Sequence, residues 1–234
     1  MPEIYGTEHV FYLTVVFSLM VLAFGILRKR VKTEKGLERT IRILGGILLA
    51  SIVWNRLSIA ILRDGWDSLL PGSFCGLTSL ALSVSALIFR KNSPVFHCLA
   101  YCGILGGLVT LAYPDFIGQA PTIWYPMTIS GLWHHTLMLF LGAFLLASGY
   151  VRPELRKWHY LPIGLSFYIC VGLFEITQLG YSDAMEIFNP ILSGTPLNWF
   201  VLGCLFLPVH ALFLFVWGVA AKRRWIRLPV LREA

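Results

Sequence analysis

The chain has 234 residues, of which 57% are hydrophobic and only 13% are charged. A soluble globular domain carries about 25% charged residues, so this composition excludes a soluble globule. The formal net charge is +7. The basic residues cluster between long apolar runs, where they act as membrane topology signals, so we expect no nucleic-acid partner. The five cysteines lie inside apolar runs without a CxxC spacing, and we therefore expect no disulfide framework, metal site or cofactor.

Seven apolar runs of about 20 residues are each long enough to cross a hydrocarbon core of roughly 30 Å as a helix. They lie at residues 9–27, 41–62, 70–89, 94–112, 126–149, 159–179 and 197–221. The first run is predicted to be a membrane anchor and not a signal peptide, because Glu3 and Glu8 precede it and the basic cluster follows it. No internal repeat or linker interrupts the series. The sequence predicts an all-α fold, with residues 1–234 forming one domain of seven transmembrane helices.

Basic residues occupy alternate loops of this arrangement. The first-to-second, third-to-fourth and fifth-to-sixth connections and the tail contain Arg28, Lys29, Arg30, Lys32, Lys35, Arg39, Arg42, Arg90, Lys91, Arg152, Arg156, Lys157, Lys222, Arg223, Arg224, Arg227 and Arg232. Among basic residues, the opposite loops contain only Arg63, together with the acidic residues Asp64, Asp67, Asp115, Asp183 and Glu186. Because basic loops remain in the cytoplasm, we expect the amino terminus outside and the carboxyl terminus in the cytoplasm.

Polar and ionisable side chains inside the predicted spans gather at one depth, in the outer half of the membrane. In chain order they are Asn55, Arg56, Cys75, His134, His135, Glu175, Gln178 and Asn198, with His210 near the middle of the last span. Such groups are costly in hydrocarbon and usually face the bundle interior or a water-filled cavity. Their shared depth predicts a single polar pocket that opens outward.

Helical spacing indicates which of these groups face inward. One face of the fifth span is formed by Gly131, His135, Leu139 and Gly142. One face of the third span is formed by Cys75, Ser79, Leu82 and Ala86. Small residues of this kind pack against neighbouring helices, so we expect Cys75 and His135 to point inward, with His134 beside them.

Each feature also has a structural interpretation. A membrane cysteine is usually an inert small hydrophobe, and an intramembrane histidine can simply hydrogen-bond a neighbouring helix. Arg56 and Glu175 can form a neutralising buried pair. The glycines at 103–107 are expected to pack helices together and not to bind phosphate. A haem or metal protein that pairs His134 or His135 with His210 is a further alternative, as is a transporter.

Three segments resemble a known family. They are LPGSFC (70–75), AYPD (112–115) and GLWHHTL (131–137). They are similar to segments of the YwaF-type bacterial integral membrane proteins, which in turn resemble the eukaryotic transmembrane protein 164 family of phospholipid acyltransferases. The resemblance covers roughly residues 65–220 and implies a multi-helix protein of the bacterial inner membrane with phospholipids as partners. It also implies that Cys75 is the nucleophile and that His135, about sixty residues later, is the base, with His134 as the alternative.

Under this hypothesis, a fatty acyl chain moves between phospholipids through an acyl-thioester on Cys75. His135 takes the thiol proton and returns it to the leaving alcohol. Arg56 is expected to bind the lipid phosphate, and Asn55 or Ser79 the oxyanion. The residues expected to bind substrate are Arg56, Asn55, Ser79, Glu175 and His210. The alternative function is non-enzymatic binding or transport of a lipid or small molecule.

Overall fold

The computed structural model describes residues 3–114, 120–190 and 194–223, and these residues form helices and turns without a β-strand. The α-helices are α1 (Thr7–Arg30), α2 (Glu34–Ile59), α3 (Phe74–Ile88), α4 (Phe96–Ala112), α5 (Pro126–Ala147), α6 (Tyr160–Leu179) and α7 (Trp199–Lys222). Each of the seven predicted runs therefore contains a helix, and the predicted all-α class is confirmed. Asp115, Arg224, Arg227 and Arg232 of the predicted loops and tail lie outside the described residues.

Five of these helices are long and apolar enough to cross a membrane. They are α1, α2 with the π-helical turn Ala60–Asp64 that extends it, α5, α6 with the short turn that precedes it, and α7. The other two are apolar but shorter, with 15 residues in α3 and 17 in α4. Helix α3 begins later than its predicted run. Pro71 has no N–H to donate, and the Ser73 hydroxyl caps the helix by accepting the Gly76 N–H at 3.2 Å.

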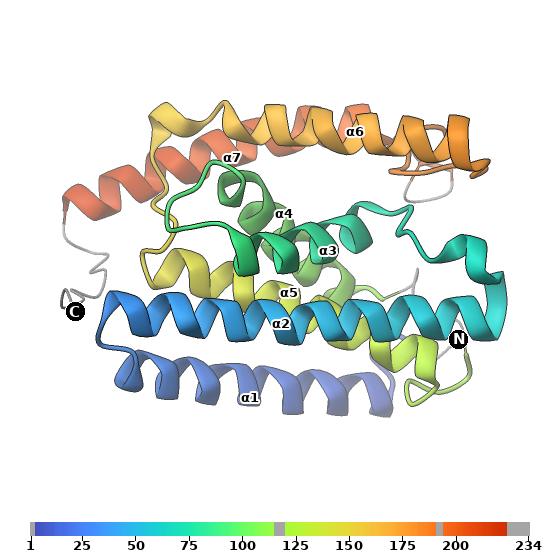
Figure 1. Cartoon of the computed structure of the whole chain (residues 1–234), viewed down its shortest axis with the longest axis horizontal. Helices are drawn as coiled ribbons and strands as arrows, with labels where there is room; N and C mark the ends of the chain where they lie inside the picture. Colours follow the sequence, from blue (N-terminus) through green and yellow to red (C-terminus); the bar gives the residue numbers. More distant parts are fainter. Residues whose placement is uncertain (1–2, 115–119, 191–193, 224–234) are drawn as a thin grey trace.

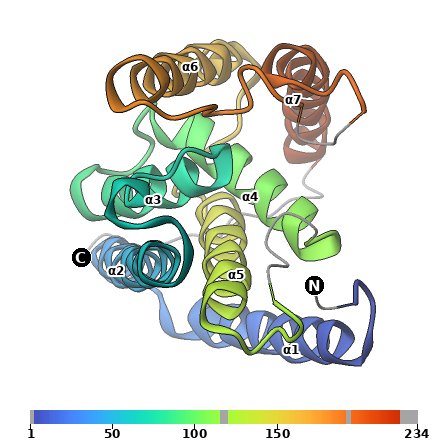
Figure 2. The same ribbon diagram turned by 90° about the vertical axis from the view of Figure 1, so that its right-hand side faces the viewer.

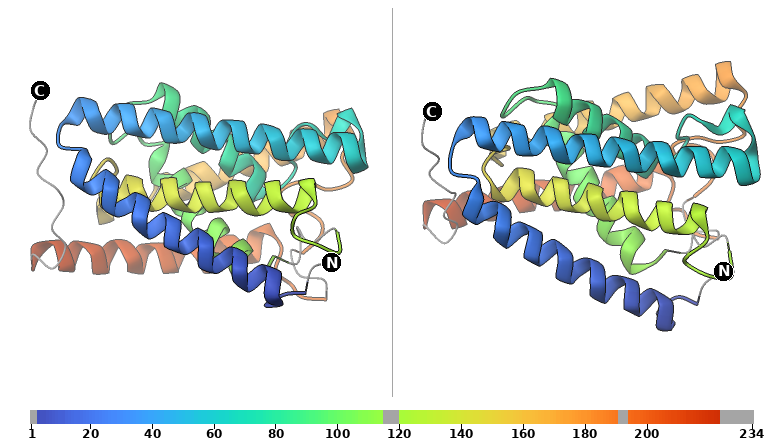
Figure 3. Two further views of the ribbon diagram at one scale, coloured as in Figure 1. Left: turned by 90° about the horizontal axis from the view of Figure 1, so that it is seen from below. Right: turned by 60° about the horizontal axis from the view of Figure 1, so that its bottom comes forward.

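Most of the helices lie roughly along one axis, and α4 crosses the bundle obliquely (Figure 1). Helix α1 ends beside the start of α2, and its amino-terminal part lies away from α2, across α5 (Figure 3). Helices α6 and α7 lie on the opposite side of the molecule from α1, with α3 and α4 between them (Figure 2). The segment at 65–73 and the one that follows α6 meet at the same end of the bundle, on the right in Figure 1.

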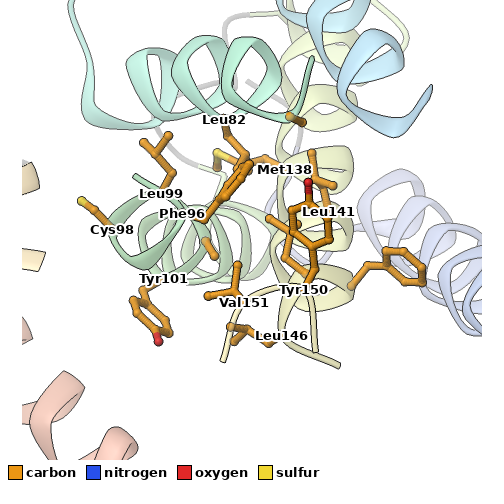
Figure 4. Close-up of a cluster of buried hydrophobic side chains, with 14 of the residues drawn as sticks. Leu82, Phe96, Cys98, Leu99, Tyr101, Met138, Leu141, Leu146, Tyr150 and Val151 are labelled. Carbon is orange, nitrogen blue, oxygen red and sulfur yellow. The ribbon is translucent and has the colours of Figure 1, made fainter. Parts of the chain in front are cut away.

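The apolar core lies where α2, α3, α4 and α5 meet. Leu82, Phe96, Met138 and Leu141 are almost completely inaccessible and pack together (Figure 4). Helices α1, α6 and α7, by contrast, bury only a few side chains each and expose many large apolar ones. Extensive exposed apolar surface is not tolerated by a soluble monomer, so these three helices form the outer, lipid-facing part of the bundle.

Glycines bring α4 and α5 into close contact. A Cβ atom placed on Gly107 would lie 2.7 Å from Cβ of Leu139 and 2.9 Å from the carbonyl oxygen of His135. One placed on Gly142 would lie 2.9 Å from a backbone oxygen of α4. The predicted packing role of the glycines at 103–107 is therefore confirmed.

Candidate functional site

Cys75 lies in the first turn of α3, at the end of the bundle where the connecting segments meet. Its half-buried thiol faces α4: Sγ lies 4.0 Å from Oγ1 of Thr110. A Cβ atom placed on Gly106 would lie 3.0 Å from the same sulfur. The predicted inward face of α3 is confirmed, because Ser79, further along this face, is also buried.

The two histidines of α5 are both buried, but they have different partners. His134 Nδ1 lies 3.0 Å from the hydroxyl oxygen of Ser79, one helical turn from Cys75 on α3. His135 Nδ1 donates to the carbonyl oxygen of Gly131 at 2.7 Å. Because a carbonyl can only accept, Nδ1 of His135 holds the ring proton in its neutral form and Nε2 is left as an acceptor. This Nε2 is buried and has no hydrogen-bond partner.

Cys75 and the backbone of α5 at His135 pack against the same turn of α4. The thiol of Cys75 contacts Gly106 and Thr110, and the α5 backbone at His135 packs on the adjacent Gly107. The His134 and His135 rings lie side by side, with their centroids 4.1 Å apart. Within the described ranges, no hydrogen bond joins the Cys75 thiol to either ring. The two imidazoles therefore lie together, and His134 reaches α3 one turn from Cys75 without a bond between the thiol and either ring.

The Arg56 side chain binds the segment that leads into α3. Its guanidinium donates to three successive carbonyl oxygens: that of Ser68, that of Leu69 at 3.3 Å and that of Leu70 at 3.2 Å. Glu175, on α6, is buried and its Oε2 has no hydrogen-bond partner. No ion pair joins Arg56 to Glu175 in the part of the chain that the structure describes, although the two charges interact at longer range.

Asn55 and Ser79 both connect helices. The side-chain amide of Asn55 donates to the hydroxyl oxygen of Ser130 at 3.1 Å and to the carbonyl oxygen of Met127 at 3.4 Å, which links α2 to α5. The Ser79 hydroxyl contacts both His134 and the sulfur of Met138, at 3.2 Å, which links α3 to α5. Both polar groups are therefore occupied by neighbouring helices.

His210 belongs to a different group of side chains. Its ring packs on Tyr101 of α4, with centroids 4.5 Å apart, and it interacts electrostatically with His97. None of its ring contacts or hydrogen bonds reaches the Cys75 group among the residues described. Nor do these residues contain a cluster of three or more His, Cys, Asp or Glu side chains that could hold a metal ion.

Glu186 is a candidate that the sequence pattern did not single out, because it appeared only as one acid of an outer loop. Its carboxyl accepts a hydrogen bond from the backbone of Phe74, the residue before Cys75, and it interacts electrostatically with the Cys75 thiol. Burial, together with the nearby carboxylate of Asp183, raises the pKa of Glu186 to about 7. The contact joins residues far apart in the chain, and the local pattern contains no signal for it.

The comparisons with known proteins agree with the helical architecture. The sequence model of the TMEM164 family matches residues 4–219. No curated protein and no solved structure matches the chain. The matched range begins before α1 and ends within α7, and the apolar helices identify the chain as a membrane protein. It therefore belongs to the TMEM164 family.

Proposed function

We propose that this chain is a membrane-embedded acyltransferase that moves a fatty acyl chain between phospholipids, with Cys75 as the nucleophile. One observation supports this most directly. The Cys75 thiol faces Gly106 and Thr110 of α4, and His134 of α5 contacts Ser79, one turn along α3 from Cys75. A cysteine beside a histidine is the usual arrangement for an activated thiol nucleophile.

The proposed reaction has two balanced halves. In the first, His135 Nε2 accepts the thiol proton, and the sulfur attacks the carbonyl carbon of a glycerolipid ester. The C–S bond forms, the ester C–O bond breaks, and the histidine returns the proton to the glycerol oxygen that leaves. In the second half, the hydroxyl of another lysolipid attacks the thioester by the same steps in reverse, which regenerates the thiol.

His135 is the favoured base because its Nδ1–H is fixed by Gly131 and its Nε2 is free to accept a proton. His134 is the alternative base, because it contacts α3 through Ser79. In either case the sulfur and the imidazole must come together when the lipid binds, since catalytic hydrogen bonds often tighten only in the substrate complex.

The acyl-transfer test uses the purified full chain in vesicles that contain a labelled donor phospholipid and a lysophospholipid acceptor. We expect Cys75→Ser to abolish transfer and to remove a hydroxylamine-sensitive acyl group from the enzyme. His135→Ala is expected to slow transfer about 100-fold or more, and His134→Ala is expected to slow it less. Cys170→Ser is the matched control, because Cys170 is exposed on α6. Equal transfer by the wild type and Cys75→Ser would contradict the proposal.

We further propose that all seven helices cross a bacterial plasma membrane, with the amino terminus outside and the site facing the outer leaflet. The clustering of basic residues in alternate connections supports this orientation. Single cysteines placed at Glu3 and at Lys32, in a chain without accessible native cysteines, should react with an impermeant reagent from opposite sides of the membrane. Reaction of both from the same side would exclude this topology.

A further inference from the structure

Residues 180–190, which we call the outer strap, follow α6 and fold back over the start of α3 (Figure 2). The Tyr181 hydroxyl donates to the carbonyl oxygen of Leu70 at 3.1 Å. The backbone N–H of Met185 donates to the carbonyl oxygen of Gly72 at 2.7 Å. The outer strap therefore binds the segment that leads directly to Cys75.

The outer strap is packed into the bundle. Met185 is completely buried, and a Cβ atom placed on Gly172 of α6 would lie 2.8 Å from its side chain. A Cβ placed on Gly72 would lie 3.1 Å from the Tyr181 ring, so the absence of a side chain at 72 lets the outer strap approach. Met185 and Glu186 have φ angles of 52° and 50°. Non-glycine residues keep such angles only where the surrounding structure fixes them.

This backbone conformation places the Glu186 carboxyl on the first turn of α3. The N–H groups of a first helical turn lack partners within the helix and attract negative charge. The Ser73 hydroxyl accepts a hydrogen bond from the N–H of Gly76, and the Glu186 carboxyl accepts one from the backbone of Phe74. The second carboxyl oxygen, Oε2, is buried without a hydrogen-bond partner. The carboxyl thus occupies the positive end of α3 beside Cys75, with which it interacts electrostatically.

We propose that Glu186 is a positioning residue that restrains ionisation of the Cys75 thiol while the outer strap is closed. This inference deepens the proposed function and rests on Cys75 as the acyl acceptor. A carboxylate next to a thiol disfavours the thiolate, and here it also occupies the helix terminus that would otherwise stabilise that thiolate. Protonation of the carboxyl, or its displacement when the outer strap opens for a lipid, releases the thiol for attack.

The charges around the outer strap leave Glu186 able to respond to pH near neutrality. Asp183 of its own segment and Cys75 of α3 interact electrostatically with Glu186, whereas Arg56 on α2 interacts with Tyr181 and with Glu175 on α6. The Arg56 guanidinium is bound by backbone carbonyls. The pKa of Glu186 is raised to about 7, mainly by burial and further by Asp183. The restraint on ionisation of Cys75 is therefore weak well below pH 7, where Glu186 is protonated, and complete well above pH 7, where Glu186 is a carboxylate.

The test measures alkylation of Cys75 by N-ethylmaleimide in the full chain, followed by mass spectrometry of the Cys75 peptide. Alkylation needs no lipid substrate, so its outcome is independent of the acyl-transfer assay. In Glu186→Gln the rate should rise tenfold per pH unit, with the thiolate fraction. In the wild type the rise should flatten near pH 7. We expect equal rates at about pH 5.5 and a rate about threefold higher in Glu186→Gln at about pH 8.5. Removing the carboxylate should raise the thiolate fraction of Cys75 about tenfold. The alkylation rate rises only about threefold, because a less basic thiolate is also a weaker nucleophile.

Two controls separate charge from access. Glu8→Gln removes another outer-end carboxylate, which binds Thr122 and Ile123, and should leave the wild-type profile unchanged. Tyr181→Phe weakens the outer strap but keeps Glu186, so it should raise the rate at every pH and retain the flattening near pH 7. A wild-type profile without flattening would overturn the proposal, whether or not any variant folds. Two results for Glu186→Gln would also overturn it: alkylation rates equal to those of the wild type at every pH, or rates higher than the wild type by the same factor at every pH.

Discussion

The adjacent glycines Gly106 and Gly107 should respond differently to the same substitution, alanine. A Cβ on Gly107 would meet Cβ of Leu139 at 2.7 Å and the carbonyl oxygen of His135 at 2.9 Å, and neither atom can move without α5. A Cβ on Gly106 would meet only the ends of side chains, Sγ of Cys75 at 3.0 Å and Cε of Met138 at 3.4 Å. The first substitution therefore separates two helices, whereas the second displaces two adaptable groups.

The magnitudes follow from packing and helix propensity. Overpacking costs about 1–3 kcal/mol, and the rigid neighbours of Gly107 place it at the upper end of this range. Replacing glycine by alanine inside a helix returns about 1 kcal/mol. Gly107→Ala should therefore destabilise the fold by about 2 kcal/mol, about thirtyfold in the unfolding equilibrium. Gly106→Ala should change stability by less than about 1 kcal/mol and slow the alkylation of Cys75.

Both values are measurable by reversible unfolding of the purified chain in mixed micelles of increasing dodecyl sulfate fraction, followed by circular dichroism. Gly46→Ala is the reference variant, because nothing lies within 4 Å of a Cβ placed there. It should be neutral or slightly stabilising. Equal destabilisation by the substitutions at 106 and 107, or a neutral Gly107→Ala, would refute the close contact between α4 and α5.

Three further predictions use the same unfolding assay. Ser79→Ala removes the partner of His134 and leaves a buried imidazole nitrogen unpaired, so it should cost about 1–3 kcal/mol. Asn55→Ala breaks the link to Ser130 and should cost about 1–2 kcal/mol, and a neutral result would argue against a structural role for this amide. The raised pKa of Glu186 means that the folded state holds this proton more tightly than the unfolded state. Its contribution to stability is therefore complete below about pH 4.5 and is lost as the pH rises through 7. Relative to Glu186→Gln, the wild type should lose about 2 kcal/mol over this range, allowing for partial exposure; a pH-independent difference would contradict it.

The sequence predicted the helices well because their signal is local. Apolar run length and charge placement located all seven helices, although α2 begins at Glu34, seven residues before its predicted run. The small-residue face of α3 identified its buried side, whereas α5 is buried on almost every side. Long-range contacts left no such signal. Arg56 was expected to meet a lipid phosphate, but its guanidinium binds the carbonyl oxygens of residues 68–70. Glu186 lies beside Cys75 only because the outer strap folds back over α3. Hydrophobic alternation and helical periodicity are local patterns, so they cannot predict this long-range contact.

The shortness of α3 has a consequence for the bilayer itself. Its 15 residues rise about 22 Å, less than the roughly 30 Å of a hydrocarbon core. Figure 1 shows its first turn set back from the end of α2. The carbonyl groups of the non-helical approach at 68–70 have no helical partners, and the Arg56 guanidinium binds them instead. Under the proposed function and orientation, membrane thickness would therefore affect the reaction, because longer lipid tails would move the ester plane away from a thiol whose height the protein fixes.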